Sequence, residues 1–276
     1  MSSFPYHIAA VSYLNTRPLI EGLDARTDVE LHLAVPARLL DLLVSGQSDV
    51  ALLPVIDYQR TDDLVILPGC CIGSDGPALT VRIFGRVPIP QIRRLRLDTE
   101  SHSSNALARI LLAEVYGITP VIADADADAD ATVYIGDKVV TRPPTDMPYD
   151  IDLGQVWKQW SGLPFVFAAW MGPRDRISQG LVDALMGARR IALERIDAIV
   201  QQYAVPRQWP SDLARHYFLE ILQYELDISP GSPQRRAIER FHQLAAKHGI
   251  IPAPAKPLDV WKPEGSHNRG DSVLHQ

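Results

Sequence analysis

The sequence has few of the residues that build disulfides or metal sites. Its 276 residues include two cysteines, the adjacent Cys70 and Cys71. Because neighbouring side chains of a strand point to opposite faces, a disulfide between them would be strained. We expect both to be small core residues in a reducing compartment. Neither Cys-x-x-Cys nor His-Glu-x-x-His occurs, and the run ADADADADA lacks the glycine and glutamate of a calcium loop. We therefore predict no metal site.

Long apolar runs and an excess of positive charge are also missing. No run approaches the ~18 apolar residues of a membrane span, and the opening MSSFPYHIAAVSYL has no basic segment of a signal peptide. We expect a cytoplasmic protein with no membrane partner. The net charge of −6 argues against a nucleic-acid partner. The oligomeric state is not predicted by any of these features.

Three common catalytic motifs are absent as well. There is no Gly-x-Ser-x-Gly elbow, no P-loop and no Gly-x-Gly-x-x-Gly, which disfavours covalent hydrolysis, nucleotide hydrolysis and dinucleotide redox chemistry. Two classes of function remain open. One is a binding protein for a small anion, and the other is an enzyme that acts on such an anion without a metal or cofactor.

Predicted strands and helices alternate along the first part of the sequence. Residues 7–14, 29–35 and 49–59 are typical of strands, and residues 36–46 have Pro36 and Gly46 at the two ends of a predicted helix. This favours an α/β fold with a mainly parallel sheet. Residues 95–136 repeat the pattern, and helical spacing dominates residues 178–203, 212–226 and 233–248.

Two segments are predicted to cross between lobes, residues 86–94 and 168–176. We therefore expect one discontinuous lobe of residues 1–86 and 174–276 and a second lobe of residues 87–173. Ligands of open α/β sheets bind beyond the carboxyl ends of the strands. Polar loops follow several predicted strands, so we expect them to converge on a cleft between the lobes.

The entrance of one predicted helix is unusually rich in hydroxyl groups. In LRLDTESHSSNALARILLAEVYG, residues 95–117, Thr99, Ser101, Ser103 and Ser104 surround the helix start. One serine is enough to cap a helix. The surplus favours a carboxylate or phosphate site at the helix N-terminus, although capping alone explains one of the serines. His102 is a hydrogen-bond donor, a proton carrier or an exposed loop residue.

Other candidates follow other strands, and each also has a plain structural interpretation. Asn15 supplies a neutral amide or forms a turn, and Arg17 pairs with a carboxylate or forms a surface ion pair. Ser74 and Gly76 belong to a tight turn that would also let a ligand approach the backbone. Asp137, after Gly136, is a general base or ties down its own loop.

Five segments together resemble the MqnA family of chorismate dehydratases, which act in the futalosine route to menaquinone. They are AVSYLNTRPL, GQSDVALLPVIDYQR, LDTESHSSNALARILL, YIGDKVV and DIDLGQVWKQWSGLPFVFAAW, in this order from about residue 7 to about residue 250. The resemblance implies a two-lobed fold like the class II periplasmic binding proteins. It also implies conversion of chorismate to 3-[(1-carboxyvinyl)oxy]benzoate without a cofactor.

The resemblance also implies roles for single residues. Asn15 matches the asparagine of the first motif and would orient the leaving hydroxyl or the enolpyruvyl group. Ser103 and Ser104 would hold one carboxylate, and Ser74 with Gly76 would hold the substrate from the other lobe. The predicted catalytic residues are Asn15 and Asp137, and the predicted substrate-binding residues are Ser12, Arg17, Ser74, Gly76, Thr99, His102, Ser103, Ser104 and Gly136.

The general base stays open at this point. It is the enolpyruvyl carboxylate of the substrate, Asp137 or His102. His102 departs from the family pattern, which usually has arginine there and thus a permanent charge. The alternative functions are the sister enzyme that makes 1,4-dihydroxy-6-naphthoate, for which a histidine in the cleft is expected, and a non-catalytic cytoplasmic small-anion-binding protein.

Overall fold

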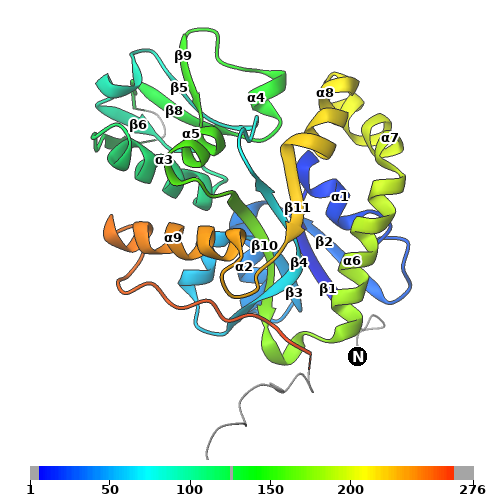
Figure 1. Cartoon of the computed structure of the whole chain (residues 1–276). Helices are drawn as coiled ribbons and strands as arrows, with labels where there is room; N and C mark the ends of the chain where they lie inside the picture. Colours follow the sequence, from blue (N-terminus) through cyan, green and yellow to red (C-terminus); the bar gives the residue numbers. More distant parts are fainter. Residues whose placement is uncertain (1–5, 125–126, 264–276) are drawn as a thin grey trace, which may run out of the picture.

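Two mixed β-sheets organise the chain. The computed structural model describes residues 6–124 and 127–263. The first sheet has the order β11-β4-β10-β3-β1-β2 and the second the order β7-β6-β8-β5-β9. Figure 1 shows the second sheet with α3, α4 and α5 at the upper left, apart from the first sheet in the centre. The predicted α/β architecture with two lobes is present.

The first sheet contains six strands from both ends of the chain. They are β1 (Tyr6–Val11), β2 (Val29–Ala34), β3 (Val50–Pro54), β4 (Leu64–Ser74), β10 (Phe165–Pro173) and β11 (Leu222–Leu226). β1 pairs in parallel with β2 and β3, whereas β10 runs antiparallel to β3 and β4, and β11 runs antiparallel to β4. The sheet is thus parallel on one side only, not mainly parallel as expected.

The second sheet has five shorter strands. They are β5 (Val81–Gly85), β6 (Arg94–Arg96), β7 (Val121–Ala123), β8 (Ala131–Ile135) and β9 (Tyr149–Asp152). Part of the alanine–aspartate run, residues 125–126, lies outside the described residues.

Nine α-helices of the described residues accompany the two sheets. They are α1 (Arg17–Ile20), α2 (Pro36–Val44), α3 (His102–Glu114), α4 (Lys138–Thr141), α5 (Leu153–Ser161), α6 (Gln179–Glu194), α7 (Ile196–Ile199), α8 (Ser211–His216) and α9 (Pro233–Lys247). Within the two described stretches, no helix has both the length and the apolar character to cross a membrane.

The crossings between the sheets lie elsewhere than expected. The chain leaves the first sheet after β4 and enters the second at β5, and it returns through α5 to β10. Residues 81–85, expected in the first lobe, therefore belong to the second sheet, and residues 165–173, expected in the second lobe, belong to the first. The segment 86–94 connects two strands of one sheet. Strand pairing depends on residues far apart in the chain, which the local pattern does not reveal.

The C-terminal region is less helical than the sequence indicates. The range 212–226 was expected to be one helix, but it consists of α8, a π-helical turn (Tyr217–Ile221) and β11. The burial of LQYEL alternates along β11, which is the period of a strand. This alternation covers only five residues and directly follows residues with helical spacing, so the whole range was predicted as one helix. The pairing of β11 with β4 brings Tyr217 toward the cleft.

Candidate active site

A pocket lies between the two sheets and takes residues from both. It encloses about 650 Å³ of empty space, solvent at its mouth included. Its polar lining residues are Tyr13, Asn15, Thr80, Glu100, Ser101, Ser104 and Tyr217. The remaining lining is Val11, Leu52, Pro54, Ile72, Ala78, Val81, Ile135, Gly136, Phe167, Ala168 and Leu222. A mostly apolar pocket with a few converging polar groups is typical of a small-molecule site.

Asn15 is fixed from behind by the first sheet. It lies in the 3-10 turn Leu14–Thr16 that follows β1, and its backbone carbonyl accepts a hydrogen bond of 2.9 Å from the Tyr224 hydroxyl. Tyr224 is on β11 and only 2% exposed. Burial raises the pKa of the Tyr224 phenol, so it remains a donor at neutral pH. This buried contact uses only the main chain of Asn15, so the side-chain amide is left to line the pocket.

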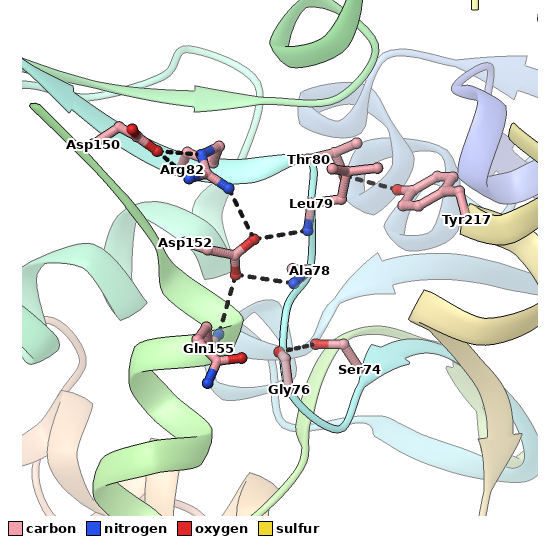
Figure 2. A network of polar contacts seen from close by, with 10 residues as sticks. All are labelled: Ser74, Gly76, Ala78, Leu79, Thr80, Arg82, Asp150, Asp152, Gln155 and Tyr217. Carbon is pink, nitrogen blue, oxygen red and sulfur yellow. Dashed lines mark hydrogen bonds and ion pairs between the residues drawn. The ribbon is translucent and has the colours of Figure 1, made fainter. Parts of the chain in front are cut away.

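A polar chain runs from Asn15 across the cleft. The Asn15 side chain lies near the Tyr217 hydroxyl, which lies 2.7 Å from the Thr80 hydroxyl (Figure 2). The Thr80 carbonyl accepts the N–H of Gly136 at 2.9 Å. Gly136 has a φ of +71°, a conformation that a side chain would strain. Three pocket elements are thus joined, and burial raises the pKa of Tyr217 so that it stays protonated.

The serines at the start of α3 have different partners. Ser101 caps the helix by accepting the Ser104 N–H at 3.3 Å, and both residues line the pocket. The Ser103 hydroxyl instead accepts the N–H of Ile56 at 3.2 Å. Because Ile56 lies in the 3-10 helix Val55–Arg60 after β3, Ser103 ties the second lobe to the first. The hydroxyl-rich entrance therefore serves both the pocket and the contact between lobes.

His102 belongs to the same inter-lobe contact. Its Nδ1 lies 2.9 Å from both oxygens of Asp57, whose side chain is 1% exposed and also faces the Arg60 Nε at 3.2 Å. His102 does not line the pocket. It lies beside Ser103 on the surface of α3 that contacts the first lobe.

Asp137 occupies a second contact between the lobes. It follows β8, lies 3.5 Å from the Arg207 Nε and is outside the pocket lining. Burial raises the pKa of its carboxyl, while Arg207, the Trp209 indole and the Leu14 N–H oppose the rise.

The structure brings only some of the predicted site residues together. Asn15, Ser104 and Gly136 line the pocket. Ser12 and Thr99 are exposed, and the Arg17 guanidinium stacks on the Tyr203 ring at 4.3 Å. Among the predicted residues, Ser12, Arg17, Ser74, Gly76, Thr99, His102, Ser103 and Asp137 are outside the pocket lining.

The turn with Ser74 and Gly76 supports a crossing. The Ser74 hydroxyl donates to the Gly76 carbonyl at 3.2 Å. Beyond this turn, the Asp152 carboxylate accepts the N–H groups of Ala78 at 2.9 Å and Leu79 at 2.8 Å, as Figure 2 shows. Asp152 also caps α5. The two chain segments that join the lobes are therefore fastened to each other beside the pocket.

Five polar lining residues are not among the predicted site residues, and of these only Ser101 was considered, as a member of the hydroxyl-rich helix entrance. Tyr13 lies two residues before Asn15, and Glu100 directly precedes Ser101. Both could therefore have been predicted from the position of these neighbours in the sequence. Thr80 and Tyr217 gave no local signal, because only strand pairing places them at the cleft.

The pocket lining includes one acidic residue and no basic one. The acidic residue is Glu100, and there is no lysine, arginine or histidine among the described lining residues. The Tyr13 hydroxyl is buried beside Glu100, and burial together with this carboxylate raises the pKa of Tyr13. Within residues 6–124 and 127–263, no cluster of three or more His, Cys, Asp or Glu side chains is placed to hold a metal.

The sequence model of a family described as menaquinone biosynthesis matches residues 6–247. A chorismate dehydratase from Thermus thermophilus is 30% identical over 261 residues, covering 86% of this chain and 94% of the relative. One from Campylobacter jejuni is 25% identical over 237 residues, covering 86% and 90%.

The fold is shared with a periplasmic binding protein. The periplasmic aliphatic sulphonate binding protein SsuA from Escherichia coli matches with a TM-score of 0.65 at 13% identity, over 100% of this chain and 97% of that one. This similarity confirms the predicted periplasmic-binding-protein-like fold and, at such low identity, concerns the fold alone.

Proposed function

The chain belongs to the menaquinone biosynthesis family, as its resemblance predicted, and we propose that it is a chorismate dehydratase. It would convert chorismate to 3-[(1-carboxyvinyl)oxy]benzoate and water. Two relatives with this name, each matching 86% of the chain, support the assignment. The structural observation that carries it is the pocket between the lobes, where Asn15 faces the serine-rich N-terminus of α3.

The reaction suits a pocket whose polar lining, apart from Glu100, consists of neutral groups. Chorismate loses the C3 proton and the C4 hydroxyl, and the ring becomes aromatic. No electrons are gained or lost overall, so the reaction needs no redox cofactor, and our proposal includes no metal. The C3 hydrogen is vinylogous to the ring carboxylate. Hydrogen bonds to that carboxylate therefore stabilise the negative charge that develops as the proton leaves.

The N-terminus of α3 is the proposed site for one carboxylate. The helix has 13 residues, so its first turn offers backbone N–H groups and the positive end of a dipole. Ser101 and Ser104 add hydroxyl groups at the same wall. Ser103 would act indirectly, because its hydroxyl holds this turn against Ile56.

Asn15 is the proposed group for the leaving hydroxyl or the enolpyruvyl group. Its amide donates and accepts hydrogen bonds without adding charge. Tyr217 and Thr80 continue the donor chain across the pocket. The turn with Ser74 and Gly76 would support the substrate through Ala78 and Thr80 rather than by direct contact.

The test is incubation of the purified protein with chorismate in the presence of a chelator, followed by mass spectrometry. Loss of one water supports the dehydratase. Chorismate that is bound but unchanged supports the non-catalytic anion-binding protein, and no interaction contradicts both. The sister enzyme that makes 1,4-dihydroxy-6-naphthoate has less support, because His102 binds Asp57 and does not line the pocket. We place the reaction in the cytoplasm as part of the proposal, since the family description is biosynthetic.

A further inference from the structure

The role proposed for Asn15 needs an amide that points into the pocket in one fixed direction. Asn15 lies in the 3-10 turn Leu14–Thr16, and in such a turn a carbonyl accepts the N–H of the residue three positions further along. For the Asn15 carbonyl this residue is Pro18, which has no N–H. The 3-10 pattern therefore offers this carbonyl no donor.

The hydroxyl of Tyr224 supplies a donor to this carbonyl, at 2.9 Å. Tyr224 belongs to β11, an edge strand of the first sheet, and lies 209 residues further along the chain. Its side chain is 2% exposed and shares the buried face of β11 with Leu222, which lines the pocket. Tyr224 is not among the described lining residues, so it would act on a substrate only through other residues.

A bulge in β4 supports the placement of Tyr224. The pairing of β11 with β4 shifts register between Gln223 and Glu225, so Tyr224 faces both Cys71 and Ile72. A bulge of this kind changes the direction of nearby side chains. The Cys71 thiol donates to the carbonyls of Glu225 at 3.5 Å and Gln223 at 3.7 Å. The main chain on both sides of Tyr224 is therefore held by one buried thiol.

The ring of Tyr224 is held separately from its hydroxyl. The Arg189 guanidinium, on α6, lies 4.5 Å from the ring centroid, within the range of a cation–π contact. Phenylalanine at this position would keep the ring contact and lose the hydrogen bond to Asn15 alone. Tyr224→Phe is therefore a clean removal of that one bond.

Resting on the proposed function, we propose that Tyr224 is a positioning residue, which sets the direction of the Asn15 amide through its hydrogen bond to the Asn15 carbonyl. The carbonyl and the Cα of Asn15 lie in one rigid peptide plane, so rotation of this plane moves the side chain as well. A displacement of about 1 Å at a group that orients the substrate can lower the rate by as much as about 100-fold.

The expected effect of Tyr224→Phe is on kcat. The variant loosens the Asn15 amide without removing it, so kcat should fall by about tenfold, less than a full misplacement would cost. An interaction that orients the reacting groups counts mainly in the transition state, so KM should change by less than about threefold.

The matched control is Tyr58→Phe. Tyr58 is 1% exposed, its hydroxyl donates to the Pro257 carbonyl at 2.9 Å, and the Lys256 ammonium lies 3.9 Å from its ring centroid. It is outside the pocket lining. Because its hydroxyl also accepts the Asp259 N–H at 2.7 Å, Tyr58→Phe should lose at least as much stability toward urea as Tyr224→Phe. It should nevertheless keep the kcat of the wild type.

The adjacent cysteines provide a second pair of variants. Cys71→Ala removes the donor behind Tyr224, a weak hydrogen bond, and should lower kcat by about threefold. Cys70→Ala is its control, since the Cys70 thiol contacts the Met186 sulfur instead, and should keep kcat. This pair tests the same geometry if Tyr224→Phe does not fold.

The experiment measures kcat and KM for chorismate, and urea unfolding, for the wild type and the four variants. A lower kcat with KM retained in Tyr224→Phe and Cys71→Ala, but not in their controls, supports the proposal. Wild-type kcat in both would overturn it, and so would an equal loss of kcat in Tyr224→Phe and Tyr58→Phe, which indicates a general effect of lower stability. A raised KM with unchanged kcat would also contradict it. A wild type that leaves chorismate unchanged would instead refute the proposed function.

Discussion

Asp152 fastens the two segments that join the lobes, and its removal is expected to destabilise the fold strongly. The side chain is 8% exposed. It accepts the N–H groups of Ala78, Leu79 and Gln155 at 2.9, 2.8 and 3.0 Å and contacts the Arg82 Nη1 at 3.3 Å. Leu79 has a φ of +62°, so Asp152 also holds a residue in an unfavourable backbone conformation.

The expected cost of Asp152→Ala follows from these contacts. Loss of the α5 cap costs about 1 kcal/mol. Each of the two N–H groups of the first crossing, left without its acceptor, costs about 1–3 kcal/mol. Since such contributions are not additive and water reaches part of the site, we expect a loss of about 4 kcal/mol in the free energy of unfolding. This is a large part of the ~5–15 kcal/mol of a typical domain.

Equilibrium unfolding in urea at pH 7 measures this loss. The matched control is Asp150→Ala, which removes the other carboxylate partner of Arg82. The Asp150 side chain is 36% exposed, so its loss should cost at most about 1 kcal/mol. Equal losses in the two variants would refute the view that Asp152 holds the crossings. Because Ala78 and Thr80 line the pocket, Asp152→Ala should also lower kcat/KM.

Three further predictions concern turnover and pH. Asn15→Ala should abolish most turnover of chorismate, measured by steady-state kinetics, because its amide is the proposed partner of the leaving hydroxyl or the enolpyruvyl group and lines the pocket; activity near wild type would count against this. Folded Asp137→Asn and His102→Ala should keep turnover, since neither side chain lines the pocket; complete loss in either would return that residue to the catalytic candidates. Burial lowers the pKa of His242 from 6.5 to about 4, so the unfolded state binds a proton at a higher pH than the folded state does. The contribution of neutral His242 to the free energy of unfolding is therefore complete above pH 6.5 and is lost as the pH falls toward 4. His242→Gln keeps a donor to the Val55 carbonyl and should lose ~3 kcal/mol less than wild type between pH 7 and 4, as urea unfolding at both values would show.

Local signals predicted those elements whose ends are marked by capping residues. Pro36 begins α2 as expected, Ser101 caps α3, and Pro233 begins α9. The places where the chain changes sheet were mispredicted, because residues 81–85 resembled an ordinary strand of the first lobe and residues 168–173 of β10 were predicted to be part of a crossing. Their partners, β8 and β4 among them, are set by contacts distant in sequence.

The site residues, too, were predicted only as far as local sequence signals reach. That polar loops after strands converge on a cleft could be predicted, and Asn15 and Gly136 are found there. The sequence could not predict which of two adjacent serines faces the pocket, because Ser103 and Ser104 point about 100° apart on the helix. Ser104 lines the pocket, while Ser103 contacts Ile56. That difference depends on how α3 packs, which the sequence does not state.

The most direct test of the account asks whether chorismate loses water in this pocket. Ala168, on β10, lines the pocket, and Ala168→Phe would fill it. We predict that the wild type converts chorismate to a product lighter by one water and that the folded variant, checked by circular dichroism, does not. Equal conversion by both proteins would contradict the account, as would a wild type that leaves chorismate unchanged.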